Sequence, residues 1–555
     1  MISVRGTLTA SSPHFAPPLT PTVNSLTVVI PPASMLDANS SSLAHAAQNA
    51  VLIALSLAFL PLDTFVLGVS IVLGLFKKSW VEKHRRDVRS PHTSVRDTKT
   101  ILVTGVGMTK GLALARTFFA AGHNVIGADF EPLLLPVSCG RTSKALKAFH
   151  RLDKPGADGS AKYIQSILDI IRKESVDIWV SCSGVASAIE DGEAKELIEQ
   201  TTRCKAIQFD VATTKKLHEK HSFIEYTKSI GLPTPDTHTI TSKAAALKML
   251  DEAAARKGKR AGMKYIMKYI GTDDSVRADM TLLPFDTPAA TKAHISRLPI
   301  SEDRPWILQQ YISGPEYCTH ALVIRGEVKV FVACPSAELL MHYEALPATS
   351  GLSQSMLRFT QEYAAAGGDS FTGHLSFDFL VEMGEAEAGL KDPTHNVQLY
   401  PIECNPRAHT AVALFNETPE MANAYITLLR ESSADRNEQR RKHGLTNGNA
   451  SQPVFPNTPT KKYYWVGHDL AELVLLPLLA LFTPGSGMDV PQLSASISTF
   501  IDHFFFWKDG TFEVWDPWPA FWLYHVYWPV QFVLAILQGK KWSRLNVSTT
   551  KMFMC

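Results

Sequence analysis

The sequence predicts an α/β domain followed by an α+β domain, with an apolar segment ahead of both. Three observations support this fold class. Between residues 100 and 212, apolar strand-like runs alternate with helical patterns, which is the βαβ order of a parallel sheet. Between 213 and 430, strand patterns follow one another closely and include a hairpin, as in an antiparallel sheet with helices. Residues 46–76 are almost continuously apolar.

Composition narrows the function classes. The chain has 555 residues, which is enough for roughly two to four domains. Hydrophobic residues make up 45% and charged residues 19%, as in folded proteins. The net charge of +2 gives no reason to expect a nucleic-acid partner. The seven cysteines form no CxxC pair, so neither a zinc cage nor a disulfide framework is predicted, and a reducing compartment is favoured.

The N-terminal region predicts membrane association. Residues 1–45 are rich in Ser, Thr, Pro and Ala and are expected to be a disordered tail. The apolar segment 46–76 is long enough to span a bilayer, but Pro61 and Asp63 interrupt it. A span, a re-entrant hairpin, an interfacial anchor and a helix packed on the protein's own surface are therefore all open. The basic linker 77–99 favours a cytoplasmic location for everything downstream.

The α/β region opens with a glycine-rich turn. "KTILVTGVG" is a predicted strand, "TKGLALARTFFAAG" a helix, and "NVIGADF" and "VDIWVSCSG" are further strands. Gly105, Gly107, Gly111 and Asp129 approach a dinucleotide-binding fingerprint, although the third glycine comes one residue late. A nicotinamide-dependent reductase is thus an alternative, but no Tyr-x-x-x-Lys pair accompanies it. The simpler interpretation is that these glycines turn a βα unit or line a small-molecule pocket.

The α+β region begins with one predicted helix, "TTKKLHEKHSFIEYTKSIG", and continues as strands. "CTHALVIRGEVKVFVAC" is a hairpin with Arg325 and Gly326 at its turn. "GHLSFDFLVEM" and "NVQLYPIECN" are two more strands, and an acidic loop is expected between them. Residues 431–462 then read as a polar linker, and 463–555 form an aromatic-rich C-terminal region.

The last of these strands carries polar side chains on one face. Alternation places Glu403, Asn405 and Arg407 together and Cys404 on the opposite face. Asp378 lies in the strand expected to pair with this one. Three oxygen donors suit Mg²⁺, and an arginine beside them suits a phosphate. The alternative is a salt-bridged sheet surface.

Further polar positions precede this pair of strands. Lys268 lies within the strand "YIMKYI", where an inward lysine is costly unless it meets an anion. Lys220 precedes a helix. "WILQQYISGP" is an apolar strand and turn whose backbone can bind a purine edge, and Glu316 follows where a ribose hydroxyl could be held.

This order of residues resembles the ATP-grasp superfamily, in which two α+β lobes grip ATP and an α/β domain precedes them. The resemblance implies ATP and Mg²⁺ as cofactors and assigns each polar position a role. The nucleotide-binding residues would be Lys220 and Lys268 on the phosphates, Gln309, Gln310 and Ile312 at the adenine, and Glu316 at the ribose. The magnesium ligands would be Asp378, Glu403 and Asn405, with Arg407 on the transferred phosphate.

A closer resemblance is to the mycosporine-glycine synthase branch. It rests on "GMTKGLALARTFFAAGH", "RPWILQQYISGPEYCTH" and "IECNPRAHTAVALF", and it covers most of the chain from about residue 100 to 550. It implies that ATP phosphorylates the enol oxygen of 4-deoxygadusol, which then condenses with glycine. The expected partners are therefore a cyclohexenone-type molecule and an amino acid.

The resemblance leaves some roles open. Arg277, in "DSVR", is expected to anchor the substrate's oxygens or the amino acid's carboxylate. His409, His320 and His374 are candidates for a base or for positioning groups. Other ATP-grasp carboxylate–amine ligases, the reductase and a membrane-anchored scaffold without catalysis remain as alternatives.

Overall fold

The structure is a computed structural model. It describes residues 36, 39–88, 98–132, 135–156, 159–182, 184, 187–256, 262–269, 281–336, 341–429, 452–483 and 486–555, without the side chains of 76–88. Most of the predicted tail 1–45, part of the basic linker 77–99 and most of the polar linker 431–462 lie outside these residues, as does Arg277.

The predicted α/β domain is confirmed. Its five strands are all parallel and lie in the order β3-β2-β1-β4-β5. They are β1 (Thr100–Thr104), β2 (Asn124–Phe130), β3 (Ala148–Leu152), β4 (Ile178–Val180) and β5 (Lys205–Ile207). The helices between them are α2 (Thr109–Ala120), α3 (Ala161–Glu174) and α4 (Ala188–Thr201). Apolar residues of β1 are fully buried, as expected of a sheet covered on both faces.

The prediction of a single helix over 213–231 is wrong, because the chain bends between two shorter helices. The structure has α5 (Val211–His218) and α6 (Lys220–Ser229), with Glu219 between them in an extended conformation. Asp210 caps α5 by accepting a hydrogen bond from the backbone N–H of Thr213 (2.7 Å). The bend makes Lys220 the first residue of α6.

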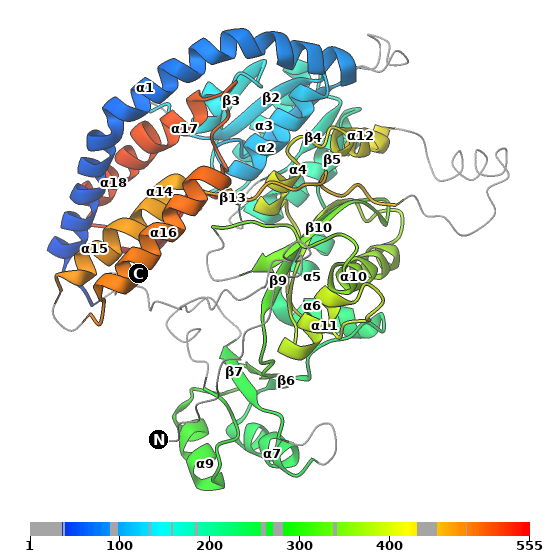
Figure 1. Cartoon of the computed structure of the whole chain (residues 1–555). Coiled ribbons are helices and arrows are strands. Elements are labelled where there is room, and N and C mark those ends of the chain that lie inside the picture. The colour runs from blue at the N-terminus through cyan, green and yellow to red at the C-terminus, as the bar shows by residue number, and fades with distance from the viewer. Residues whose placement is uncertain are drawn as a thin grey trace, which may run out of the picture.

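A small lobe follows, shown at the lower end of Figure 1. Its antiparallel sheet has the order β6-β8-β7. Its elements are β6 (Thr237–Ile240), α7 (Lys243–Ala254), β7 (Tyr265–Tyr269), α9 (Pro288–Arg297) and β8 (Trp306–Gln310). Trp306, Leu308 and Tyr265 of the sheet form a core with residues of both helices.

The second lobe is an antiparallel sheet in the order β10-β9-β11-β12. Its strands are β9 (Glu316–Ile324), β10 (Glu327–Ser336), β11 (Gly373–Leu380) and β12 (Tyr400–Asn405). The predicted hairpin turn is confirmed: Arg325 and Gly326 both have positive φ angles. Helix α10 (Gly351–Gly367) covers one face of the sheet, where Cys404 packs into the core as predicted.

The prediction of an acidic loop between β11 and β12 is wrong in part, because this segment contains a helix, α11 (Met383–Lys391). Ala386 of this helix is buried, and Val397 beyond it packs into the same core. After β12, the chain continues through the short helices η5 (Thr410–Phe415), α12 (Glu420–Ile426) and η6 (Thr427–Leu429). Val454, within the expected linker 431–462, pairs with Val330 at the edge of β10.

The C-terminal region is mostly helical. Its helices are α14 (Val466–Asp469), π-helical η7 (Leu470–Leu475), α15 (Leu476–Leu481), α16 (Val490–Phe506), α17 (Trp518–Trp522), π-helical η8 (Leu523–Tyr527) and α18 (Trp528–Leu537). Its strands are β13 (Tyr463–Tyr464), β14 (Lys508–Asp509), β15 (Trp542–Asn546) and β16 (Lys551–Met554).

The N-terminal helix α1 (Ser42–Val88) is continuous through Pro61. It therefore extends beyond the apolar segment 46–76 at both ends. The absence of a turn at Pro61 contradicts the re-entrant hairpin. Figure 1 shows α1 arching along α17 and α18.

One side of α1 packs on the C-terminal region. The indole N–H of Trp542 donates to the side-chain oxygen of Asn49 (2.9 Å), and His525 pairs with Asp63 (2.8 Å). Large apolar side chains on α1 are exposed, among them those of Leu57, Phe65 and Leu75. Two helical stretches, Ser42–Leu75 and Trp518–Leu537, are long and apolar enough to cross a membrane by length and composition.

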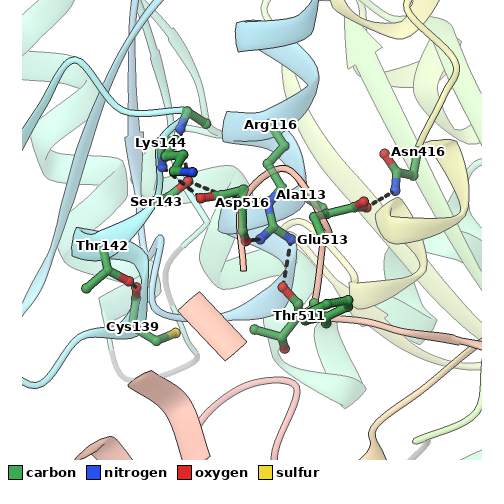
Figure 2. A network of polar contacts seen from close by, with 12 residues as sticks. Ala113, Arg116, Cys139, Thr142, Ser143, Lys144, Asn416, Thr511, Glu513 and Asp516 are labelled. Atoms are coloured by element: carbon green, nitrogen blue, oxygen red, sulfur yellow. Dashed lines mark hydrogen bonds and ion pairs between the residues drawn. The ribbon is translucent and has the colours of Figure 1, made fainter. Parts of the chain in front are cut away.

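A buried ion pair fixes the C-terminal region to the first domain (Figure 2). Arg116 of α2 donates to the carboxylate of Asp516 (3.0 Å) and to the carbonyl of Thr511 (2.8 Å). The same carboxylate accepts from the Ser143 hydroxyl (2.6 Å) and the Lys144 backbone N–H (2.8 Å). Because Asp516 is completely buried and both of its carboxylate oxygens accept hydrogen bonds, the two regions form one packed unit.

Candidate active site

The predicted magnesium ligands lie side by side on one face of the β11–β12 pair. Asp378 is directly opposite Glu403, and Ser376 is opposite Asn405. The amide nitrogen of Asn405 donates to Asp378 (3.0 Å). The expectation that these residues share a face is confirmed, and it follows from strand alternation and antiparallel register.

Negative charge is concentrated at this point. Burial, together with the neighbouring carboxylates of Glu403 and Glu316, raises the pKa of Asp378 to about 7. Burial alone would raise the pKa of Glu403. The Lys220 ammonium, 2.7 Å away, and Arg407 outweigh burial, so the pKa of Glu403 is below its usual value. Carboxylate and amide oxygens are the donors that Mg²⁺ prefers, and a divalent cation would stabilise the crowded charges. The donor set therefore fits magnesium.

The predicted phosphate-binding lysines approach from different elements. Lys220, at the start of α6, pairs with Glu403, whereas Lys268 lies on β7 of the small lobe and donates to the side chain of Gln309 (2.8 Å). Burial lowers the pKa of Lys268 to about 8, with a further contribution from Lys220. Glu403 and Glu316 oppose this shift, so Lys268 faces the acidic strands of the other lobe.

The hinge between the lobes runs from Gln310 to Glu316. The side-chain oxygen of Gln310 accepts from the backbone N–H of Asp236 (3.1 Å), which directs it toward β6. Ile312 is buried. A Cβ at Gly314 would lie 1.9 Å from the carbonyl oxygen of Val381, so only glycine fits where the hinge meets the end of β11.

Glu316 opens β9 and accepts a hydrogen bond from the hydroxyl of Ser336 (2.9 Å) on the neighbouring strand. The structure therefore brings four predicted nucleotide-binding residues to the same inter-lobe region as the predicted magnesium ligands: Lys220, Lys268, Gln309 and Glu316. Arg277 lies outside the described residues.

Three buried polar atoms beside the metal ligands have no hydrogen-bond partner among the described residues. They are Nη1 of Arg407, Nε2 of His320 and the hydroxyl of Ser376. His320 and Ser376 lie on the same face of the sheet as Asp378, by strand alternation. An unsatisfied buried polar group costs about 1–3 kcal/mol. A polar ligand bound at this position would satisfy all three atoms.

Lys110, at the start of α2 in the first domain, lies near these unpartnered polar atoms. Lys110 is only 3% exposed to solvent. Burial and, to a smaller extent, the positive charge of Arg407 lower its pKa to about 7. The charge of Lys110 in turn lowers the pKa of His320 and His409, where burial is the main cause. Lys110 and Arg407 thus place two cations around the unpartnered atoms.

Sequence reasoning missed Lys110. Its signal is a lysine in the first turn of a mostly apolar helix, within the glycine-rich stretch "TGVGMTKG". The interpretations of that stretch as a nicotinamide site, a βα turn or a pocket lining rest on its glycines, whereas a buried lysine there also predicts an anion partner.

The histidines proposed as a base have structural partners. The Nδ1 atom of His409 caps η5 by accepting from the backbone N–H of Ala411 (3.3 Å), and the backbone N–H of His409 donates to Nδ1 of His320 (3.3 Å). His374 bonds the Tyr425 hydroxyl (2.7 Å). Burial lowers the pKa of both His409 and His374 to about 3. Both are therefore neutral at pH 7, and both are too weakly basic to favour a general-base role over positioning.

The glycine turn offers no support for a nicotinamide site. The backbone N–H of Gly107 donates to Asp129, and the thiol of Cys139 donates to the Gly107 carbonyl (3.2 Å). The N–H of Thr109, in the first turn of α2, donates to the carbonyl of Ser548 from the C-terminal region (2.9 Å). Donors that a pyrophosphate would use are thus already bonded within the chain.

No family model matches the sequence, and no curated protein matches it. Several solved structures are similar. An L-amino acid ligase from Bacillus licheniformis is 14% identical, with 61% of this chain and 76% of that chain covered and a TM-score of 0.38. An N5-carboxyaminoimidazole synthetase from Staphylococcus aureus, complexed with ADP, is 13% identical, with 60% and 78% covered and a TM-score of 0.39. A phosphoribosylglycinamide synthetase from Anaerococcus prevotii is 13% identical, with 56% and 68% covered and a TM-score of 0.38. At these identities and TM-scores, the assignment of function rests on the residues themselves.

Proposed function

We propose that the chain is an ATP-dependent C–N ligase with the ATP-grasp arrangement. The observation that carries this proposal is the convergence of two lysines, three carboxylates and one amide between two antiparallel lobes, beside a buried arginine with an unpartnered nitrogen. Such a set neutralises and positions a nucleotide's phosphates, which is most of what phosphoryl transfer requires. An inert scaffold would have no reason to keep three unsatisfied polar atoms in one buried place.

The nucleotide would lie between the lobes. Lys220 and Lys268 would hold its phosphates, the backbone of the hinge its adenine and Glu316 its ribose. Asp378, Glu403 and Asn405 would hold Mg²⁺, which supplies charge neutralisation at the β- and γ-phosphates. Arg407 would bind the phosphoryl group as it is transferred.

The acceptor would lie beyond Arg407, where Lys110, His320 and Ser376 meet. Two cations and two neutral hydrogen-bonding groups suit a small anion with several oxygens. The enolate of 4-deoxygadusol, a vinylogous carboxylate, has this character. We propose it as the substrate and glycine as the amine, so that the product is mycosporine-glycine. Arg277 would hold the carboxylate of the amino acid.

The proposed chemistry has two steps. The enol oxygen attacks the γ-phosphorus, and the bond between that phosphorus and the bridging oxygen breaks, releasing ADP. The neutral amine then adds to the activated carbon, the C–O bond breaks, and phosphate leaves with the substrate's oxygen. Loss of the amine proton gives the enaminone. Lys110 and Arg407 would stabilise the enolate in the first step and the departing phosphate in the second.

A second candidate is a ligase that joins an ordinary carboxylate to an amine. The same observation favours it, because Lys110 and Arg407 would bind a carboxylate as readily as an enolate. The first domain, 100–212, would then present a different acceptor to the same ATP domain, 213–430.

We also propose that the protein associates with a membrane through α1, with the catalytic domains on the cytoplasmic side. The exposed apolar side chains of α1 support this, as do those at the ends of α15, α16 and α18, including Phe482, Phe506 and Leu537.

The test is incubation of the purified protein with ATP, Mg²⁺, 4-deoxygadusol and single amino acids, followed by mass spectrometry. Formation of ADP and mycosporine-glycine in equal amounts is expected. ADP formation only with a carboxylate and an amine would favour the second candidate. No ADP with any acceptor would refute a ligase.

A further inference from the structure

A second polar cluster lies outside the ATP site, where the helical C-terminal region meets the second lobe. It consists of His342, Asp469 and His503. The Nε2 atom of His342 lies 2.8 Å from one carboxylate oxygen of Asp469, and Nδ1 of His503 lies 2.6 Å from the other. All three potential ligand atoms lie within 4.8 Å of one another.

The cluster draws on three separate parts of the chain. His342 follows β10, Asp469 ends α14, and His503 lies in the last turn of α16. Folding therefore brings these groups together across large sequence separations. Imidazole nitrogens and a carboxylate oxygen are a common ligand set for zinc, and three such groups from protein with one open position are typical of zinc sites.

The environment also favours a cation. Asp469 is fully buried, and both of its ion-pair partners among the described residues are imidazoles, His342 and His503. A buried carboxylate requires a compensating positive charge. A divalent ion bound by all three groups would supply that charge.

The surroundings suit a bound ion in two further ways. The side chain of His342 is 37% exposed, which leaves a route for an ion to enter. The ring of Trp507 lies 4.4 Å from that of His503 and 5.7 Å from that of His342, so an aromatic wall limits the movement of both ligands. The ring of His468, 6.2 Å from His342, is near enough for a modest shift to add a fourth ligand.

We propose that His342, Asp469 and His503 bind one divalent transition-metal ion, with zinc as the preferred ion. The ion cross-links the segment after β10 to α14 and α16. That segment also carries Tyr343, whose ring lies 5.8 Å from that of His409. The ion therefore restrains the segment that packs on His409, and its site is separate from the proposed magnesium site, whose ligands are all oxygens.

The experiment uses the full chain, purified in detergent and dialysed against a chelator. Zn²⁺ is added back and counted by elemental mass spectrometry, and Co²⁺ is titrated while its visible absorption is recorded. The wild type is expected to bind one ion per chain, to show the absorption of Co²⁺ with nitrogen and oxygen ligands, and to melt at a higher temperature with Zn²⁺.

Variants decide whether the bound ion is at this site. His342→Ala, at the exposed edge, and His503→Ala are expected to weaken zinc binding by about 100-fold or more. The matched control is His395→Ala, which removes another partly exposed histidine paired with a carboxylate, Glu385 (3.0 Å). It should bind zinc as the wild type does, and so should Glu403→Gln, which alters only the ATP site.

Two results would overturn the proposal. One is a wild-type chain that binds no stoichiometric zinc or cobalt and gains no thermal stability from either. The other is zinc binding that His342→Ala leaves unchanged. If His503→Ala fails to fold, the His342→Ala variant and the Co²⁺ spectrum of the wild type still decide.

Discussion

Replacing Lys110 with methionine should make the protein more stable and much less active. Lys110 is buried, and burial lowers its pKa from its usual 10.5 to about 7. The unfolded chain therefore holds a proton that the folded chain partly releases. At 1.36 kcal/mol per unit of pKa, this difference costs the folded state about 4 kcal/mol at pH 7. Methionine keeps the volume and removes that cost, although it also removes the lysine's own polar contacts. We therefore expect a net gain of about 1–3 kcal/mol.

The pH dependence of the free energy of unfolding tests whether Lys110 destabilises the folded state. Because the pKa is lowered in the folded state, the destabilisation by Lys110 is complete below pH 7 and disappears as the pH rises toward 10.5. Wild-type stability should thus rise with pH through this window relative to that of Lys110→Met. Thermal melts of both proteins at a series of pH values measure the difference.

Activity should change in the opposite direction. A hydrogen bond from a charged donor contributes about 1.5–3 kcal/mol, so loss of Lys110 should lower kcat/KM for the acceptor by roughly 10- to 150-fold. The KM for ATP should change little. The control is Lys195→Met, which removes another buried lysine, whose pKa is also lowered by burial, on α4. It should change stability without affecting acceptor kinetics. A Lys110→Met variant that is less stable than the wild type and fully active would refute this reasoning.

Three other perturbations test separate parts of the structure. Glu403→Ala or Asn405→Ala should abolish ATP turnover while circular dichroism stays unchanged, and normal activity in either would contradict the magnesium assignment. Asp516→Ala should lower the free energy of unfolding by about 3–5 kcal/mol, because it leaves the buried Arg116 without its partner; denaturant titration showing a loss below about 1 kcal/mol would count against the packed unit. Deletion of residues 1–76 should move the protein from the membrane fraction to the soluble fraction in vesicle flotation, and continued flotation would assign binding to the C-terminal helices.

The two strands that carry the predicted magnesium ligands could be predicted because their signal is local. Glu403, Asn405 and Cys404 alternate within one strand, and Asp378 lies in the neighbouring strand along the chain. Alternation and antiparallel pairing are backbone properties that a single sequence carries. The helix break at Glu219 was missed because no proline or glycine marks the bend. For α11, the Ala- and Glu-rich run "EAEAGLK" was a usable signal.

The acceptor pocket could not be predicted in the same way. Lys110 belongs to the first domain, His320 and Ser376 to β9 and β11, and Arg407 to the chain after β12. Their meeting depends on how the domains pack, which no short motif encodes. The same holds for the cluster of His342, Asp469 and His503, whose members come from separate segments. The resemblance supplied roles for residues in several motifs, but it gave none to Lys110.

The central claim is that the substrate's own oxygen receives the γ-phosphoryl group. It is tested by incubating the protein with ATP, Mg²⁺, glycine and 4-deoxygadusol labelled with ¹⁸O at the enol oxygen, and by measuring the mass of the released phosphate. We predict one ¹⁸O atom in each phosphate formed, in step with mycosporine-glycine. Unlabelled phosphate alongside the same product, or no ADP at all, would contradict the account.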